Sequence, residues 1–487
     1  MAAIPLNRSN IGQLPEGISP PSYDPADVTP GIVHLGPGGF HRAHMARYAH
    51  DLMEMDRATL GWGITGAGLV ENDRAMLTDL EAQDGLYTLV ERGGGTETST
   101  VIGSLAGLIF AADDSAALLV AIRGARIVSL TITEHGYCLD RATRTLDFGH
   151  PLIAHDLAEP GNPRSAVGIL VEAYRQRMAQ SAPAFSAMSC DNIQHNGAVL
   201  RGAVLALAGR LNPVLAAWIA KHARFPGTMV DRITPVTQTT DVEAFVQSHG
   251  VTDRRPIFCE SFRQWVIEDD FADGRPDWDR VGAQFVADVE PYEFMKLRIL
   301  NATHLAVSGP GRLIGHETIG DTMADPALRG YAEALMERET GPTLKPVPGV
   351  DLAEYKRQII ERFANPAIVD PVERVNTDAA LNYLLDPIRD RLVTGESIEL
   401  LAFAVAAWLR RVRGIDEQGA PIDIRHPLAA QLREKAEEGG PDPRPLLAME
   451  ALFGDLGRNR AFVEPVARHL ASLYAKGAAA TLAALEI

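Results

Sequence analysis

The sequence predicts an α/β protein: an N-terminal domain built on a parallel-rich sheet, followed by a mostly α-helical C-terminal domain. Short apolar runs alternate with helical patterns up to about residue 285, whereas helical periodicity dominates from about residue 295 onward. Strands that alternate with helices indicate a parallel sheet covered on both faces. Because 487 residues are more than one ordinary core accommodates, we predict two domains, residues 1–285 and 286–487.

The predicted elements begin with an extended lead-in over residues 1–30, which are rich in Pro, Asp and Ser. A first strand at 32–35 and a helix at 42–55 follow. Further buried strands are predicted at 62–65, 87–91, 125–133 and 184–189, and helices at 166–178 and 197–211. The C-terminal domain has predicted helices at 351–363, 397–413, 427–437 and 460–475, and an Ala-rich last helix at 478–484.

The composition excludes several classes of protein. The 46 Lys and Arg against 63 Asp and Glu give a net charge of −17, which argues against nucleic acid or an anionic membrane as partner. The three cysteines, Cys138, Cys190 and Cys259, are widely spaced and form no CxxC pair, as expected in a reducing compartment. With no signal-peptide pattern and no apolar run long enough to span a membrane, we expect a cytoplasmic protein. A monomer and a homodimer are both compatible with the sequence.

A glycine-rich turn follows the first predicted strand directly, in the stretch Gly36-Pro37-Gly38-Gly39-Phe40-His41. A strand, such a turn and a helix form the dinucleotide-binding arrangement of Rossmann-type domains, in which glycines let the backbone approach the pyrophosphate. Gly36 and Gly38 occupy the first two glycine places, and His41 stands in the third. We expect Gly36, Gly38, Gly39 and Phe40 to contact the cofactor. An ordinary tight turn is the alternative.

The residue that reads the ribose of the cofactor is expected after the second strand. Glu71, Asn72 and Asp73 lie there, and a carboxylate would accept the ribose hydroxyls of NAD and repel the extra phosphate of NADP. We favour Asp73, although the sequence does not decide between it and Glu71. Both acids are also compatible with a simpler role at the start of a helix.

The stretch from Lys296 to His304 has the pattern KxxxxNxxH. In an α-helix, Asn301 lies about 140° and His304 about 80° from Lys296, so the three side chains can share one face. A tunable amine beside neutral donors suits the interconversion of an alcohol and a carbonyl. The alternative is a surface lysine, an asparagine near a helix end and a core histidine.

Several ordered segments together resemble the polyol-specific long-chain dehydrogenases, the mannitol 2-dehydrogenase family. The matching stretches are residues 36–44, 129–134 with 136–138, 189–192 with 195–197, 229–235, 295–301 with 304, and 346–351. Matches at separate places along nearly the whole chain are more specific than any single motif.

The resemblance implies a Rossmann-type N-terminal domain, a helical C-terminal domain, NAD dependence and no metal. It makes Lys296 the acid/base, Asn192 and Asn301 the donors around the reacting oxygen, and His304 a residue that positions the substrate. Arg374 corresponds to the family's cleft arginine and Asp231 to the aspartate of its Val-Asp-Arg motif, so both are expected to bind substrate.

The chain departs from the family pattern at four places. Pro37 stands where a small aliphatic residue is usual, and Thr303 replaces the commoner Ser. Ser308-Gly309-Pro310-Gly311 replaces a bulkier segment, and residues 376–384 depart from a Gly-Ser-rich pattern. The last two departures are expected to affect the substrate pocket most.

The expected mechanism is reversible hydride transfer between a polyol carbon and NAD. Because free lysine titrates near pH 10.4, a base at neutral pH needs its pKa lowered by roughly 2 to 3 units. Arg298, the oxidised nicotinamide and the apolar neighbours Leu297 and Ile299 are the expected contributors. Glu293 is either a proton relay or an ion-pair partner of the lysine.

Two other classes of function compete with this interpretation. A zinc alcohol dehydrogenase needs three close-set ligands, and Cys190 with His195 is the nearest approach to such a set. An NAD-binding sensor would need the fold without the lysine, asparagine and histidine.

The resemblance implies a neutral sugar alcohol as substrate, with mannitol oxidised to fructose as first choice. Fructuronate reductase, which acts on mannonate in reverse, and D-arabinitol 4-dehydrogenase are the alternatives. Arg374 is suited to bind either a carboxylate or neutral hydroxyls, so it does not decide between them. The match at residues 346–351 favours the neutral substrate.

Overall fold

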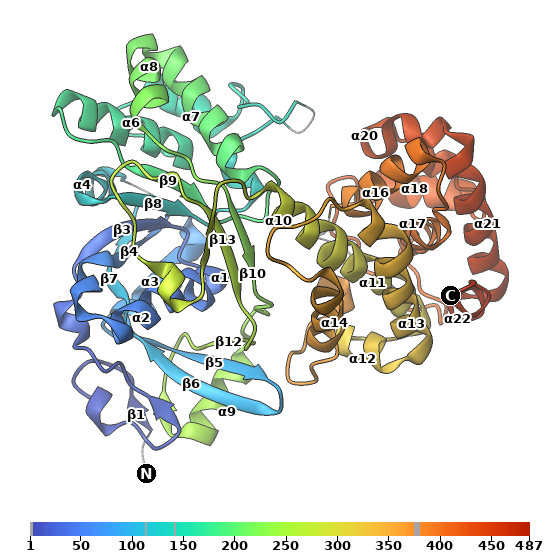
Figure 1. Cartoon of the computed structure of the whole chain (residues 1–487), viewed down its shortest axis with the longest axis horizontal. Coiled ribbons are helices and arrows are strands. Elements are labelled where there is room, and N and C mark those ends of the chain that lie inside the picture. Colours follow the sequence, from blue (N-terminus) through green and yellow to red (C-terminus); the bar gives the residue numbers. More distant parts are fainter. Residues whose placement is uncertain (1–2, 113, 141–142, 375–379) are drawn as a thin grey trace. The chain divides into compact units, whose positions relative to one another are not determined.

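The computed structural model describes residues 3–112, 114–140, 143–374 and 380–487. They form two compact units, Met1–Val289 and Glu290–Ile487 (Figure 1). The first unit contains a parallel sheet with helices on both faces, and the second is built from helices. The predicted fold class is therefore confirmed. Among the described residues, we find no helix that is both long enough and apolar enough to cross a membrane.

A five-stranded parallel sheet forms the centre of the first unit. Its strands, in spatial order, are β7 (Leu105–Phe110), β4 (Gly63–Gly68), β3 (Pro30–Leu35), β8 (Ile127–Leu130) and β9 (Ser186–Ser189). Of these five strands, β3 comes first in the chain and lies in the middle of the sheet, so the strand order reverses beside it. In open α/β sheets, ligands bind outside the carboxyl ends of the strands at this point.

Successive residues of the central strands pack into different cores, as the period-two geometry of a strand requires. Val33 and Leu35 join a core with helices α4 (Ala116–Gly124), α6 (Ala166–Ala179) and α7 (Asn196–Leu211). Ile32, which precedes Val33 and points to the opposite face of the sheet, packs instead with helix α2 (Met45–Met55) and with Trp265. Further helices described in this unit are α1 (Gly39–Ala43), α3 (Arg74–Glu81), α5 (Pro151–Ala158), α8 (Pro213–His222) and α9 (Thr239–His249).

The strand predicted at 87–91 does not belong to the parallel sheet. It forms β5 (Tyr87–Gly93), which pairs antiparallel with β6 (Thr96–Ile102) and parallel with β12 (Ile257–Glu260) in a separate sheet. The reason is the two-residue turn Gly94-Gly95, in which both residues have positive φ angles, 59° and 75°. Such a turn matches the twist of a tight antiparallel hairpin.

The predicted extended lead-in also contains two short 3-10 helices, Ile11–Gln13 and Pro25–Asp27, besides two short strands. Strand β1 (Ile4–Pro5) pairs with β11 (Val251–Thr252), and β2 (Ile18–Ser19) pairs with β6. A third small sheet contains β10 (Thr228–Asp231), β13 (Gln264–Glu268) and β14 (Gln284–Val286). The helix predicted at 42–55 is interrupted at His44, which separates α1 (Gly39–Ala43) from α2.

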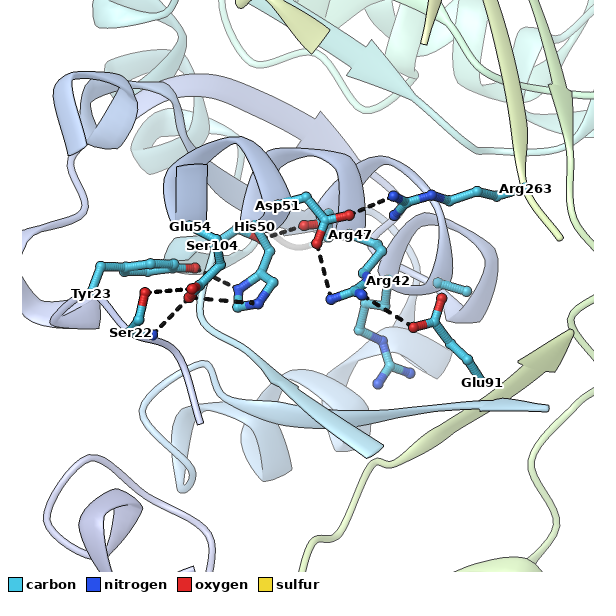
Figure 2. Close-up of polar contacts among 12 residues, drawn as sticks. Ser22, Tyr23, Arg42, Arg47, His50, Asp51, Glu54, Glu91, Ser104 and Arg263 are labelled. Carbon is cyan, nitrogen blue, oxygen red and sulfur yellow. Dashed lines mark hydrogen bonds and ion pairs between the residues drawn. The ribbon is translucent and has the colours of Figure 1, made fainter. Parts of the chain in front are cut away.

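A charged network fixes α2 within the first unit (Figure 2). Arg47 lies 3.1 Å from Asp51 and 3.3 Å from Glu91 of β5, and Arg263 lies 2.5 Å from Asp51. On the same helix, Nδ1 of the buried His50 is hydrogen-bonded to the Tyr23 hydroxyl oxygen at 2.9 Å. These contacts join α2 to β5, to the lead-in and to the segment before β13.

The second unit is organised around the buried helix α17 (Glu399–Arg411), which packs against α11 (Ala302–Ile314) and α21 (Arg460–Lys476). A Cβ atom added to Gly309 would stand 3.4 Å from the Ala407 Cβ, so the glycine permits close approach of α11 and α17. Among the described residues, this unit also contains helices α10 (Glu290–Met295), α12 (Ile319–Ala324), α13 (Pro326–Leu335), α14 (Leu352–Phe363), α16 (Asn382–Thr394), α18 (Ala429–Gly439), α19 (Arg444–Leu447), α20 (Glu450–Phe453) and α22 (Ala478–Ala483).

Candidate active site

The glycine-rich turn begins where the central strand β3 ends. Gly36 has a φ angle of +84°, and a Cβ atom there would lie 2.3 Å from the Thr131 carbonyl oxygen, so only glycine fits. At Gly38 the nearest atom to such a Cβ is 4.0 Å away, and at Gly39 it is 3.7 Å away. The first glycine therefore shapes the turn, whereas Gly38 leaves open space beside the backbone.

His41, which stands in the third glycine place, is buried and packs against strand β3. Its ring stacks on His34 of β3 with 3.5 Å between ring centroids, and His34 Nδ1 lies 2.8 Å from the Ser129 Oγ. Burial lowers the pKa of His41 well below its ordinary value, and the neighbouring His34 lowers it further. His41 is therefore neutral and packs beside the turn. Phe40 stacks on His44 and is partly exposed.

The two acids after β4 have different partners. Asp73 Oδ2 accepts hydrogen bonds from the backbone N–H groups of Leu69 and Val70, at 2.9 and 3.2 Å. The exposed Glu71 receives two hydrogen bonds from Arg74, at 2.7 and 3.0 Å. Asp73 therefore holds the turn that follows the strand. Which of the two reads a ribose stays a prediction.

The ends of β8 and β9 are joined by Asp191, which the sequence interpretation did not single out. Its carboxylate accepts from the backbone N–H groups of Ile132 and Thr133, at 3.1 and 2.8 Å, and from the Tyr137 hydroxyl at 2.7 Å. Thr133 is held at φ 60° and ψ 168°, a region that β-branched residues avoid. Burial raises the pKa of Asp191 against these hydrogen bonds, which lower it.

Asn192 follows Asp191 and is exposed, whereas Asp231, at the end of β10, is buried. Asn196 connects their two strands, because its Nδ2 donates to the Asp191 carbonyl at 3.1 Å and to the Thr228 carbonyl at 2.8 Å. These hydrogen bonds thus fix the backbone beside Asn192, the predicted catalytic donor, and beside Asp231, the predicted substrate-binding residue.

The segment Lys296–Asn301 of the second unit is a π-helix, and α11 continues from it. The predicted α-helical geometry is wrong here, because hydrogen bonds in a π-helix span five residues instead of four. Lys296 and Asn301 are five residues apart, so the wider turn brings their side chains onto one face. Both residues are buried, at 8% and 9% exposure. The short π-helical segments found within helices are frequent at functional sites.

Two neighbours of Lys296 were expected to influence its protonation. Arg298 is 2.6 Å from the Asp390 carboxylate and donates to the Thr343 carbonyl at 2.9 Å, so its charge is already matched by an acid. This weakens its expected effect on the lysine. Glu293 is buried on α10, and its role as relay or ion-pair partner stays a prediction.

His304 and Arg374 are joined by Asp370, a residue that the sequence interpretation missed. Asp370 Oδ1 accepts from Arg374 Nε at 2.8 Å, and its Oδ2 lies 3.3 Å from His304 Nε2. The His304 ring also packs on Phe363, with 4.6 Å between centroids. The spacing of four residues between Asp370 and Arg374 is the one sequence signal that an ion pair was present.

The departures from the family pattern near His304 lie inside the helical core. Ser308 to Gly311 are buried in α11, and a Cβ at Gly311 would stand 2.6 Å from the Thr322 Cγ2 of α12. These small residues therefore serve helix packing, and the expectation that they reshape a substrate pocket has no support here. In the other departing stretch, 376–384, residues 376–379 lie outside the described residues.

Cys190 and His195 do not form part of a metal centre in the described part of the chain, where no group of three or more His, Cys, Asp or Glu side chains could hold an ion. Burial and the adjacent Asp191 raise the pKa of the Cys190 thiol, which disfavours the thiolate that zinc requires.

Comparison with known proteins identifies both units. The Rossmann domain model of mannitol dehydrogenase matches residues 30–280, and the C-terminal domain model of mannitol dehydrogenase matches residues 288–474. The chain belongs to the mannitol dehydrogenase family. The resemblance found in the sequence and the predicted class of enzyme, a dehydrogenase, are thereby confirmed.

Relatives within the mannitol dehydrogenase family differ in substrate. The D-mannonate oxidoreductase of Escherichia coli is 44% identical over 478 residues, covering 96% of this chain and 98% of its own. The mannitol 2-dehydrogenase of Aspergillus fumigatus is 40% identical over 475 residues, covering 94% of each chain. The solved structure of Pseudomonas fluorescens mannitol 2-dehydrogenase with NAD and D-mannitol has a TM-score of 0.92 and 41% identity over 99% of both chains. A D-sorbitol dehydrogenase structure has a TM-score of 0.87 and 33% identity, covering 98% of this chain and all of that one.

Proposed function

We propose that this chain catalyses the NAD-dependent, reversible oxidation of a neutral sugar alcohol to a ketose, with mannitol and fructose as the first-choice pair. Residues 1–285 bind NAD in this proposal and residues 286–487 bind the substrate. The observation that carries it is the π-helical turn that places the buried Lys296 and Asn301 on one face, with His304 three residues further along. The matched Pseudomonas fluorescens relative, solved with NAD and D-mannitol, supports the same choice.

The glycine-rich turn after β3 suits a dinucleotide. Gly36 forms the turn that no other residue can form, and the open space at Gly38 leaves room for a pyrophosphate against the backbone. When bound, NAD supplies the acceptor for the hydride. Glu71 and Asp73, beyond the next strand, are the acids proposed to select NAD over NADP.

The reacting hydroxyl loses its proton to Lys296. Lys296 is buried at 8% exposure, and its amine is a group that can accept a proton in general base catalysis. The Asn301 amide donates to the alcohol oxygen as negative charge develops on it, and the family resemblance gives Asn192 the same task. Removal of one such donor typically costs about 3 kcal/mol of transition-state stabilisation.

A panel of substrates tests the proposal. Mannitol, sorbitol, arabinitol and mannonate are each offered with NAD and with NADP, and NADH formation is followed by absorbance. We expect mannitol with NAD to give the highest kcat/KM. Binding of NADH without turnover of any alcohol or ketose would instead identify a sensor.

The 44% identity with the Escherichia coli D-mannonate oxidoreductase makes fructuronate reduction the second candidate. It requires a cation for the substrate carboxylate, and Arg374 is the residue proposed for it. A higher kcat/KM for mannonate than for mannitol, with Arg374→Ala impairing only the acid, would favour this alternative.

A further inference from the structure

We propose that Asp370 is a positioning and specificity-determining residue, which orients His304 and Arg374 and adapts this part of the site to hydroxyl groups instead of carboxylates. The proposal rests on the proposed function, because it assumes that His304 and Arg374 meet the substrate.

Asp370 divides its two oxygens between two partners. Oδ1 accepts a hydrogen bond from Arg374 Nε at 2.8 Å and lies 2.6 Å from Arg374 Nη2. Oδ2 is directed toward His304 Nε2 at 3.3 Å. The carboxylate side chain is only 4% exposed, so little water competes for either oxygen.

The contact between Asp370 and His304 is incomplete. Both atoms are buried and lie 3.3 Å apart, but the contact lacks the angle of a good hydrogen bond, and neither atom has another hydrogen-bond partner among the described residues. Buried polar atoms are nearly always satisfied, so this pair is suited to a ligand group. A hydroxyl can donate to Oδ2 and accept from Nε2 at once, whereas a carboxylate has no proton to donate to Oδ2.

The charges lead to the same conclusion. Burial raises the pKa of Asp370, but His304 and Arg374 together outweigh this effect and hold the pKa below its ordinary value. The residue is therefore an anion at neutral pH, and it matches the positive charge of Arg374. A sugar acid would have to share the guanidinium with this anion and would be repelled by it. A neutral polyol meets no such repulsion.

The backbone around Asp370 is held independently of its carboxylate. The N–H of Ile319 donates to the Asp370 carbonyl at 2.9 Å, and the N–H of Val372 donates to the Glu317 carbonyl at 3.0 Å. An Asp370→Asn variant changes charge and donor pattern while leaving these bonds in place, so it is the appropriate perturbation.

The test compares wild type with Asp370→Asn on mannitol and mannonate, with NAD. We expect the KM for mannitol to rise roughly tenfold to a hundredfold, the loss typical of a hydrogen bond to a charged group, with a much smaller change in kcat. The kcat/KM ratio of mannonate to mannitol should rise at least about tenfold, because Arg374 is released from its anion. Binding of NADH should not change.

Asp416 provides the matched control. It is also a buried carboxylate of the second unit, 2.7 Å from Arg312, with a side chain 4% exposed. Asp416→Asn removes a similar charge pair away from His304, so any general loss of stability should appear in both variants while the substrate ratio changes only at position 370. Asp370→Glu, which keeps the charge, should retain the wild-type preference for mannitol.

The outcomes separate the two proposals. Wild-type turnover of polyols with an unchanged ratio in Asp370→Asn would overturn the role of Asp370 and leave the proposed function intact. A wild-type enzyme that prefers mannonate would also overturn it, and this measurement needs no variant to fold. Wild-type protein without activity on any polyol would refute the proposed function and this inference together.

Discussion

Substitution of alanine at two neighbouring glycines should separate the shape of the nucleotide turn from its binding of the cofactor. Gly36 and Gly38 stand two residues apart after β3, yet the surroundings of a new Cβ atom differ completely between them. We expect Gly36→Ala to impair folding of the first unit. Gly38→Ala should leave folding intact and weaken NADH binding.

The structure gives the magnitude of each effect. An alanine at position 36 must adopt a φ angle of +84°, which costs about 1–2 kcal/mol for a residue with a side chain. Relief of the 2.3 Å contact with the Thr131 carbonyl oxygen adds about 1–3 kcal/mol of strain. The free energy of unfolding should therefore fall by about 2–5 kcal/mol. Gly38 has an extended backbone with a φ angle of −69°, and the nearest atom to an added Cβ, the Gly36 carbonyl oxygen, is 4.0 Å away. Its substitution should therefore change stability by less than about 0.5 kcal/mol.

Urea unfolding followed by tryptophan fluorescence measures the stability of the first unit, because four of the five tryptophans precede residue 290. These are Trp62, Trp218, Trp265 and Trp278. Quenching of the same fluorescence by NADH measures cofactor binding. We expect at least a tenfold weaker NADH affinity for Gly38→Ala at unchanged urea midpoint. If Gly38→Ala bound NADH like wild type, or if Gly36→Ala were as stable as wild type, our account of the turn would be refuted.

Three further predictions concern catalysis, coenzyme choice and acid stability. Lys296→Ala should lower kcat at least about a hundredfold with NADH affinity nearly unchanged, and near-normal turnover at neutral pH would exclude the lysine as acid/base. Asp73→Ala should narrow the preference for NAD and also lower the Tm, since Asp73 holds two backbone N–H groups; equal wild-type kcat/KM with NAD and NADP would show that no carboxylate guards the ribose. Burial lowers the pKa of His50 to about 3, so this residue contributes stability that is complete above about pH 6.5 and declines below it by about 1.4 kcal/mol per pH unit. His50→Gln should therefore flatten the decline in urea midpoint between about pH 7 and pH 5, and an unchanged slope would contradict the assignment.

Much of the fold could be predicted because the elements of the parallel sheet and the helical unit carry a clear period. The predicted helix at 166–178 became Ala166–Ala179, and that at 351–363 became Leu352–Phe363. Strand pairing was harder to predict. Strand β7 was missed, and β5 was assigned to the wrong sheet. The Gly94-Gly95 turn is a local signal for its pairing with β6, whereas no local pattern encodes its pairing with the distant β12.

From the sequence we proposed a set of site residues, but we could not predict their geometry. The sequence identified Lys296, Asn301 and His304 together, whereas the π-helical turn that aligns the first two depends on packing that an α-helical period does not represent. Asp370 was missed because a single aspartate before a proline resembles an ordinary loop residue. Its contact with His304 becomes visible only when the chain is folded.

The pairing of Ile4 with Val251 has a consequence for synthesis of the protein. Strand β1 leaves the ribosome well before its partner β11, which follows only after nearly the whole first unit has been translated. At about 5–20 residues per second, the N-terminal strand waits roughly 10 to 50 s for that partner. During this time the nascent chain carries an unpaired strand edge, which makes it a substrate for chaperones and sensitive to aggregation. Slowed translation of residues 6–250 should therefore lower the yield of folded enzyme more than a similar delay in the second unit.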